Sequence, residues 1–302
     1  NQEIKITVNE GWSMAKKRVE KRDIRLIGLD LDGTTLTTDK KLTPHTKEVL
    51  EACIRQGIEV LPATGRVWSG IPEELMKMEG VHYVISSNGA AVVELATGKA
   101  VYTNGIAWDR ALEVFDILER YDTFYDAYAE GNGWCEARFY ENLNDYGIEP
   151  LIQRLVKSSR TCIEDLREWV KEHKSPIEKI NMFFRDEEKR QQAFRELSEI
   201  PDLAVTCSLT NNLEINHCTC NKGDALLNLG KILGISMEQI MACGDGNNDL
   251  EMVRNAGVGV AMENGEDSVK EAADYVTVTN DEEGVARAIE LFCDLQLKER
   301  IS

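Results

Sequence analysis

Two aspartates, Asp30 and Asp32, follow a short apolar segment and are separated by a single leucine. In a bending loop this spacing could turn both carboxylates toward one site, where they would offer oxygen ligands to a hard cation. Gly33 follows directly, and a glycine there lets the backbone turn and present N–H groups to an anion. Because acidic turns after strands are common, the pair predicts a site only if other parts of the chain support it.

A second acidic loop gives that support. The segment from Gly244 to Asp249 carries Asp245 and Asn248 and follows another apolar segment. Aspartate, asparagine and glycine also suit turns and helix caps, but the two loops together provide several oxygen ligands of the kind that Mg²⁺ prefers. A calcium-binding EF-hand is the competing interpretation, and its D-x-N-x-D-G spacing with a closing glutamate is not present.

Two further loops carry groups suited to phosphate. Thr64 and Gly65 offer a hydroxyl and a backbone N–H, and Lys222 offers a point charge at the start of a predicted helix. Taken singly, Thr64 is better explained as a helix cap and Lys222 as a surface lysine. Their order along the chain and their placement after predicted strands favour a shared site.

The elements that must position these residues alternate between strand and helix, which predicts a doubly wound parallel sheet. We expect all four motifs at strand-to-helix loops on one edge of that sheet, where open α/β sheets bind ligands. Strands are predicted at Ile24–Leu31, Ile58–Ala63, Val81–Ser86, Leu213–Asn216, Ile240–Cys243, Val258–Ala261 and Tyr275–Val278, and helices at Pro44–Gln56, Val67–Glu79, Lys222–Leu233, Asn247–Asn255, Ser268–Ala273 and Glu282–Cys293.

The texture of the sequence changes after Asn88-Gly89, where strands become amphipathic and aromatic residues concentrate. We therefore predict an inserted α+β cap domain at residues 89–207 and a discontinuous core domain at 24–88 and 208–302. Residues 1–23 are interpreted as an N-terminal extension that can derive from the expression vector, and they are left out of the fold.

The bulk composition is that of a globular chain of about two domains, with 302 residues, a formal net charge of −18 and a pI near 4.8. Such a charge disfavours nucleic acid and anionic membranes as partners, and the absence of a long apolar run makes the cytoplasm the expected location. The eight cysteines are interpreted as reduced thiols. Cys218 and Cys220 lie beside His217, but no second pair completes the spacing of a zinc site.

Together these motifs resemble those of the haloacid dehalogenase superfamily, and more closely its Cof-like branch of phosphatases, which carries a large α/β cap. The resemblance covers roughly residues 24–293. The core motifs are specific, whereas the cap is matched only by its position, its size and its pattern of amphipathic strands and aromatic residues. The matching strings are Asp30–Leu36, Ala63–Arg66, Ser87–Ala90, Lys222–Leu226, Gly244–Met252 and Gly257–Met262.

The resemblance implies a role for each motif residue. Asp30 would be the nucleophile and Asp32 the general acid and base, and both would hold Mg²⁺ with Asp245, Asp32 through its carbonyl. Asp249 would orient the metal ligands from behind. The phosphoryl group would be bound by Thr64, Lys222 and Asn248 and by the backbone amides of Leu31 and Gly65.

The expected activity is Mg²⁺-dependent hydrolysis of small phosphate monoesters, such as sugar phosphates, through an aspartyl-phosphate. Because Asp32 must be protonated when the alcohol leaves, we expect its pKa to lie above the solution value. A phosphomutase or specialised sugar-phosphate phosphatase of the same superfamily is one alternative, and a non-catalytic phosphate-binding regulator is another. The insert is expected to act as a lid, with Asn88 and Gly89 at its hinge. The sequence does not identify the substrate or the oligomeric state.

Overall fold

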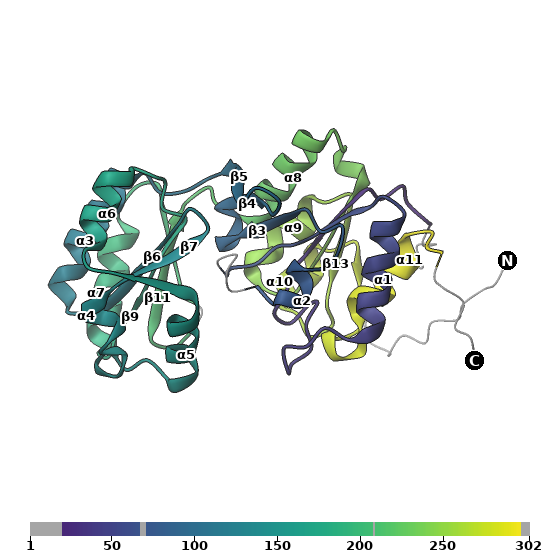
Figure 1. Cartoon of the computed structure of the whole chain (residues 1–302). Coiled ribbons are helices and arrows are strands. Elements are labelled where there is room, and N and C mark those ends of the chain that lie inside the picture. The colour runs from purple at the N-terminus through teal and green to yellow at the C-terminus, as the bar shows by residue number, and fades with distance from the viewer. Residues whose placement is uncertain (1–19, 67–70, 208, 297–302) are drawn as a thin grey trace.

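A computed structural model describes residues 20–66, 71–207 and 209–296 of the chain, and Figure 1 shows two packed units joined by a small sheet. The first unit is built on a parallel sheet of order β14-β13-β12-β1-β2. Its strands are β1 (Leu26–Leu29), β2 (Glu59–Pro62), β12 (Ile240–Gly244), β13 (Val258–Ala261) and β14 (Tyr275–Val276), and its helices are α1 (Pro44–Arg55), α2 (Glu73–Met76), α8 (Lys222–Leu233), α9 (Leu250–Asn255), α10 (Asp267–Ala272) and α11 (Gly284–Phe292).

Helices cover both faces of this core sheet. Ile27 and Leu29 of β1 pack in one apolar cluster with residues of α1 and α11, whereas Leu26 packs on the other face with Leu226 and Leu229 of α8. Neighbouring residues of a strand point to opposite faces, so a strand of four buried residues can serve both layers. The predicted doubly wound parallel sheet is confirmed.

The second unit is a mixed sheet of order β10-β11-β9-β6-β7-β8. Its helices α3, α6 and α7 lie on the side of the sheet away from the core (Figure 1). The strands are β6 (Phe124–Ala129), β7 (Asn132–Glu136), β8 (Arg160–Ile163), β9 (Lys179–Phe183), β10 (Leu203–Thr206) and β11 (Asn212–His217), and the helices are α3 (Trp108–Leu118), α4 (Ala137–Tyr140), α5 (Pro150–Ser159), α6 (Leu166–His173) and α7 (Glu187–Ser198). This α+β unit is the cap.

Between the two units lies an antiparallel sheet of β3 (Tyr83–Ser86), β4 (Ala91–Glu94) and β5 (Lys99–Thr103). It is joined to the core by a parallel bridge from Ala63 to Ile85. The buried side chains of β4 fall into the same apolar clusters as the core strands.

Three element predictions are wrong in part. The strand at Val81–Ser86 exists as β3, but it pairs with β4 in the antiparallel sheet and is joined to the parallel sheet by the isolated Ala63–Ile85 bridge. The strand at Leu213–Asn216 exists, but it is β11 and pairs with β9 and β10 in the cap sheet rather than with a core strand. An apolar strand that alternates with polar residues has the same pattern in either sheet, so its sequence does not reveal its neighbours. The helix predicted at Val67–Glu79 begins outside the described residues, and the described part is helical only at α2, after Pro72.

The domain boundaries stay a prediction. From the strand pairings we propose that the core extends through β5 and that the cap runs from residue 104 to the end of β11, near residue 217. Residues 1–19 of the predicted extension lie outside the described residues. Among the described residues, no helix combines the length and the apolar character needed to cross a membrane.

Candidate active site

Asp30, Lys222 and Asp249 form the buried centre of the site. The Nζ of Lys222 donates to Asp30 Oδ1 at 2.6 Å and to Asp249 Oδ1 at 2.7 Å, and the lysine side chain has no exposed surface. Asp30 follows β1, Asp249 follows β12, and Lys222 is the first residue of α8. Three segments more than twenty residues apart in the chain therefore meet at one point, as the sequence predicts.

Lys222 reaches this point by a different route from the one expected. It follows a cap strand, so α8 must enter the core from the cap. Asn221 caps the helix by accepting from Asp224 N at 2.7 Å. Gly89 has a φ of +98°, and a Cβ there would overlap the carbonyl of Asn221, so a glycine lets the 87–89 turn pack against the start of α8.

Asp245 completes a group of carboxylates. One carboxylate oxygen each of Asp30, Asp245 and Asp249 lie within 4.8 Å of one another. Asp249 Oδ2 accepts from the backbone N–H groups of Asp245 and Gly246, both at 3.0 Å, and its Oδ1 accepts from Lys222. Asp249 is thus occupied in holding the loop and the lysine, which leaves Asp30 and Asp245 as the carboxylates to hold a cation.

The charge balance of the group fits a divalent cation. Three carboxylates face one buried ammonium, and burial raises the pKa of Asp30 despite the opposing effect of Lys222. Burial raises the pKa of Asp245 as well, although Thr34 Oγ1 donates to its Oδ1 at 2.7 Å. A hard divalent cation among these oxygens would offset the excess negative charge.

Asp32 faces two cations and not the buried centre. Arg66 binds it with two hydrogen bonds, Nε to Oδ2 at 2.9 Å and Nη2 to Oδ1 at 2.7 Å, and Lys40 Nζ lies 2.8 Å from Oδ1. Although burial raises the pKa of Asp32, the hydrogen bonds from Lys40 and Arg66 outweigh it and hold that pKa below its usual value. The expected raised pKa of Asp32 is wrong for this arrangement of the site.

The residues expected to bind phosphate line the same loops. Thr64 is buried beside Arg66, whose backbone N–H donates to Thr64 Oγ1 at 3.2 Å. Asn248 Nδ2 donates to Asn88 Oδ1 at 3.2 Å, and the Asn88 side chain lies against Gly65. Leu31 is buried directly after Asp30. Their roles toward phosphate stay predictions, but the structure brings all of these loops together.

Sequence reasoning gave no role to several residues of this site. Thr34 and Arg66 lie inside the motif strings and could have been found there, whereas Lys40 lies in no recognised pattern. Lys179 of the cap strand β9 donates to the carbonyl of Gly65 at 3.0 Å. Glu178 beside it accepts from Ser87 Oγ at 2.8 Å. No local signal marks these two residues, because the contact exists only when the cap lies against the core.

The model of the haloacid dehalogenase-like hydrolases matches residues 27–289 of the chain. The chain therefore belongs to this family, and the Cof-like assignment, the α/β core and its cap are confirmed. The chain is a hydrolase.

Particular relatives are phosphatases. The 5-amino-6-(5-phospho-D-ribitylamino)uracil phosphatase YcsE of Bacillus subtilis (strain 168) is 30% identical over 271 residues, which cover 88% of this chain and 95% of that protein. The phosphatase YwpJ of the same organism is 30% identical over 282 residues, covering 87% and 98%. Phosphatases of this family generally use a divalent metal. In this chain the cluster of carboxylates from Asp30, Asp245 and Asp249 is the group of side chains suited to hold one.

Solved structures agree with the fold. A haloacid dehalogenase-like hydrolase from Bacteroides thetaiotaomicron superimposes with a TM-score of 0.74 at 28% identity, covering 88% of this chain and 98% of that one. The sugar phosphatase BT4131, of subclass IIB, superimposes with a TM-score of 0.70 at 23% identity over 88% and 98% of the two chains, which is a likeness of fold.

Proposed function

We propose that this hydrolase is a Mg²⁺-dependent phosphatase that cleaves small phosphate monoesters through an aspartyl-phosphate on Asp30. The observation that carries the proposal is the buried contact of Asp30 with Lys222, next to the carboxylates of Asp245 and Asp249. Phosphoryl transfer requires mainly positioning and charge stabilisation, and this group provides both.

The proposed reaction has two displacements. An Asp30 carboxylate oxygen bonds to phosphorus while the ester P–O bond breaks, and Asp32 gives a proton to the departing alkoxide. Asp32 then takes a proton from water as the water oxygen attacks the phosphorus and releases Asp30. When bound by Asp30, Asp245 and the Asp32 carbonyl, Mg²⁺ supplies positive charge that reduces repulsion between the carboxylate and the phosphate.

The remaining phosphate contacts follow from the loops around Asp30. Lys222 gives one charge to the phosphoryl oxygens, and Thr64 and Asn248 give hydrogen bonds, with the Leu31 and Gly65 amides beside them. For Asp32 to act as an acid, it must leave the two hydrogen bonds from Arg66 and its ion pair with Lys40. A substrate phosphate can attract the Arg66 guanidinium more strongly than the Asp32 carboxylate does, because the phosphate is a dianion.

The polar side chains on one face of the cap sheet suit a polar, hydroxyl-rich substrate. Asp126, Lys179, Asn181 and Glu214 lie on one face of its sheet, because cross-strand pairs place Asp126 and Glu214 opposite Asn181. Within the described residues, Asp126 Oδ1 is buried without a hydrogen-bond partner, although Oδ2 accepts from Arg160 Nε at 2.7 Å. A buried acceptor of this kind suits a substrate hydroxyl or N–H.

Sugar phosphates and related metabolites carry such groups. The phosphorylated ribitylamino-uracil named for YcsE combines a hydroxylated chain, an aromatic amide ring and a phosphate, and it belongs in any substrate panel. We propose that the cap closes over such a substrate as a lid and excludes water. We also propose the cytoplasm as the site of action, since all eight cysteines are free thiols.

The test is phosphate release from p-nitrophenyl phosphate and a panel of phosphorylated metabolites, with and without Mg²⁺. The wild type should require Mg²⁺, and Asp30→Asn should reduce release to background. Asp39→Asn, in an exposed aspartate of the next loop, is the matched control and should keep wild-type activity. Release without Mg²⁺, or release that survives Asp30→Asn, would overturn the proposal, and no release at all would favour the phosphate-binding regulator.

A further inference from the structure

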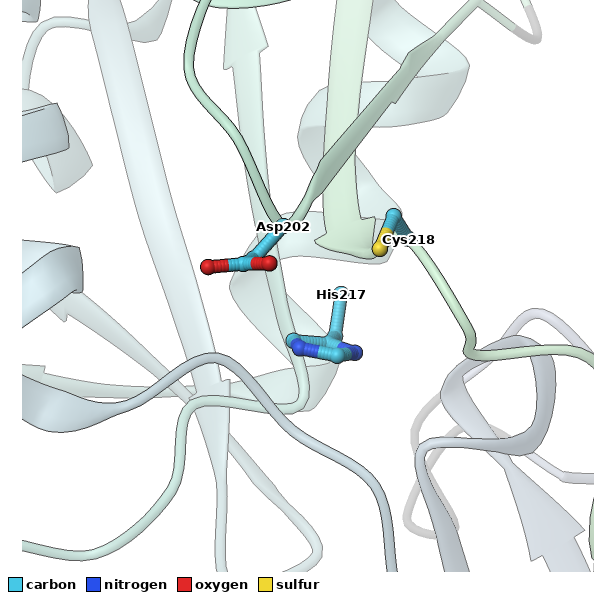
Figure 2. Close-up of side chains that lie close together, drawn as sticks. All are labelled: Asp202, His217 and Cys218. Carbon is cyan, nitrogen blue, oxygen red and sulfur yellow. The ribbon is translucent and has the colours of Figure 1, made fainter.

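A second group of metal-ligating side chains lies at the β10 edge of the cap sheet and shares no residue with the carboxylates around Asp30. One ligand atom each of Asp202, His217 and Cys218 lie within 4.8 Å of one another (Figure 2). The antiparallel pairing of β10 with β11 sets this arrangement, since Leu203 is opposite His217 and Cys218 N donates to Asp202 O at 2.8 Å. Cys218 lies just after β11 ends at His217, where side chains no longer need to alternate between the two faces of the sheet. Its side chain can therefore lie on the same side as that of His217.

The imidazole of His217 is held in place by its own hydrogen-bond chain. Its Nδ1 lies 2.9 Å from Thr219 Oγ1, and Asn104 Nδ2 donates to the same hydroxyl at 3.0 Å. Thr219 N also lies 3.4 Å from Nδ1, so both contacts engage this nitrogen, and we assign Nε2 as the nitrogen that would bind a ligand. Histidines that bind metals commonly have their second ring nitrogen fixed by such a partner, which orients the ring.

We propose that Asp202, His217 and Cys218 bind a borderline-soft divalent cation of the Zn²⁺ class. A carboxylate, an imidazole and a thiolate are all ligands of Zn²⁺, whereas the oxygen-only group around Asp30 suits Mg²⁺. The two anionic ligands balance the charge of the cation. Cys220, the other cysteine of the pair, faces away, since its Sγ lies 3.4 Å from the carbonyl of Asn88.

The position of the site gives it a structural consequence. Asn104 follows β5, where the chain passes from the core into the cap, and Thr219 lies where the chain returns to α8. A cation on His217 and Cys218 therefore fixes the return segment four residues before Lys222, and the Thr219–Asn104 contact links it to the outgoing segment. Binding should restrain the cap relative to the core without placing a ligand in the Asp30 group.

The test is metal binding by the full chain in saturating Mg²⁺, with Co²⁺ as a spectroscopic probe and Zn²⁺ as a competitor. Wild type should show a thiolate-to-Co²⁺ charge-transfer band that Zn²⁺ abolishes, and the carboxylates around Asp30 cannot produce such a band. Cys218→Ser should lose the band, and His217→Ala and Asp202→Asn should each weaken Zn²⁺ binding by at least about tenfold.

Thiol labelling provides the matched control within one chain. Cys162, Cys207 and Cys218 are all exposed, so Zn²⁺ should protect Cys218 from alkylation and leave the other two reactive. Cys207→Ser should bind Zn²⁺ as the wild type does. Unchanged phosphatase activity of the variants with Mg²⁺ alone shows that they fold. Equal alkylation of Cys218 with and without Zn²⁺, or a charge-transfer band that persists in folded Cys218→Ser, would overturn the proposal.

Discussion

Lys222 in the core and Lys179 in the cap are both buried lysines paired with carboxylates, yet they occupy very different surroundings. Lys222 lies between Asp30 and Asp249, with two short ion pairs. Lys179 lies 3.2 Å from Glu214 and donates to the carbonyl of Gly65, and its ammonium is 4.7 Å from the ring centre of Tyr128. The first lysine acts inside one unit, and the second joins the two units.

The difference separates two tasks that the site must perform. The group around Lys222 is complete without the cap, so it can handle the phosphoryl group of any ester. The group around Lys179 contacts the core at Gly65 and Ser87, so its arrangement can depend on what is bound between cap and core. We therefore expect changes at Lys222 to affect all substrates alike and changes at Lys179 to depend on the substrate.

The largest effect is expected for Lys222→Met. Removing the ammonium leaves Asp30 and Asp249 buried without their shared partner, and breaking a buried pair in this way costs about 3–5 kcal/mol of folding stability. We expect kcat to fall at least about 100-fold for every substrate. Thermal unfolding and steady-state kinetics measure the two effects. Lys231→Met, in an exposed residue of the same helix, is the control, and an active Lys222→Met protein would remove the lysine from the proposed mechanism.

A smaller and selective effect is expected for Lys179→Met. The variant loses the hydrogen bond to Gly65 and the ion pair with Glu214, so the cap should bind a polar leaving group more weakly. We expect kcat/KM to fall about tenfold for hydroxyl-rich phosphate esters and little for p-nitrophenyl phosphate. Exposed Lys189→Met is the control. Equal losses for both classes of ester would contradict the division of tasks between the two lysines.

The smallest effect concerns the pH profile. Lys40 is one of the two cations that hold the pKa of Asp32 below its usual value, so Lys40→Ala should raise that pKa. Since Asp32 acts as an acid when protonated, the high-pH limb of kcat should move to higher pH, and the shift should be small because the Lys40–Asp32 pair is partly exposed. Exposed Lys41→Ala should leave the profile unchanged. A downward shift would mean that Asp32 is not the acid.

The core site could be predicted from the sequence because its residues sit in contiguous strings. Asp30, Thr64 and Asp245 each lie in a short loop after a strand, and the geometry of a parallel sheet brings such loops together. The special glycine of the first loop also has a local cause: Gly33 has a φ of +91°, and a Cβ there would overlap the Asp245 carboxylate.

The cap could not be predicted in the same way. Lys179 and Glu214 are polar residues at alternate positions of two strands, and such residues usually face solvent. Here Lys179 is buried and Glu214 half-buried, because strand pairing places them on the face that meets the core. For the same reason the sheet of the Leu213 strand was predicted wrongly, and Asp202 could not be linked to His217 before the register of β10 and β11 was known.

The phosphoryl group that we propose on Asp30 can be trapped chemically. The wild type is mixed with Mg²⁺ and a reactive phosphate ester, quenched in acid within the first turnovers, digested and mapped by mass spectrometry. We expect a phosphoryl group on the peptide that contains Asp30, lost on hydroxylamine treatment and missing in Asp30→Asn. A phosphoryl group on another residue, or none in an enzyme that turns over, would contradict it.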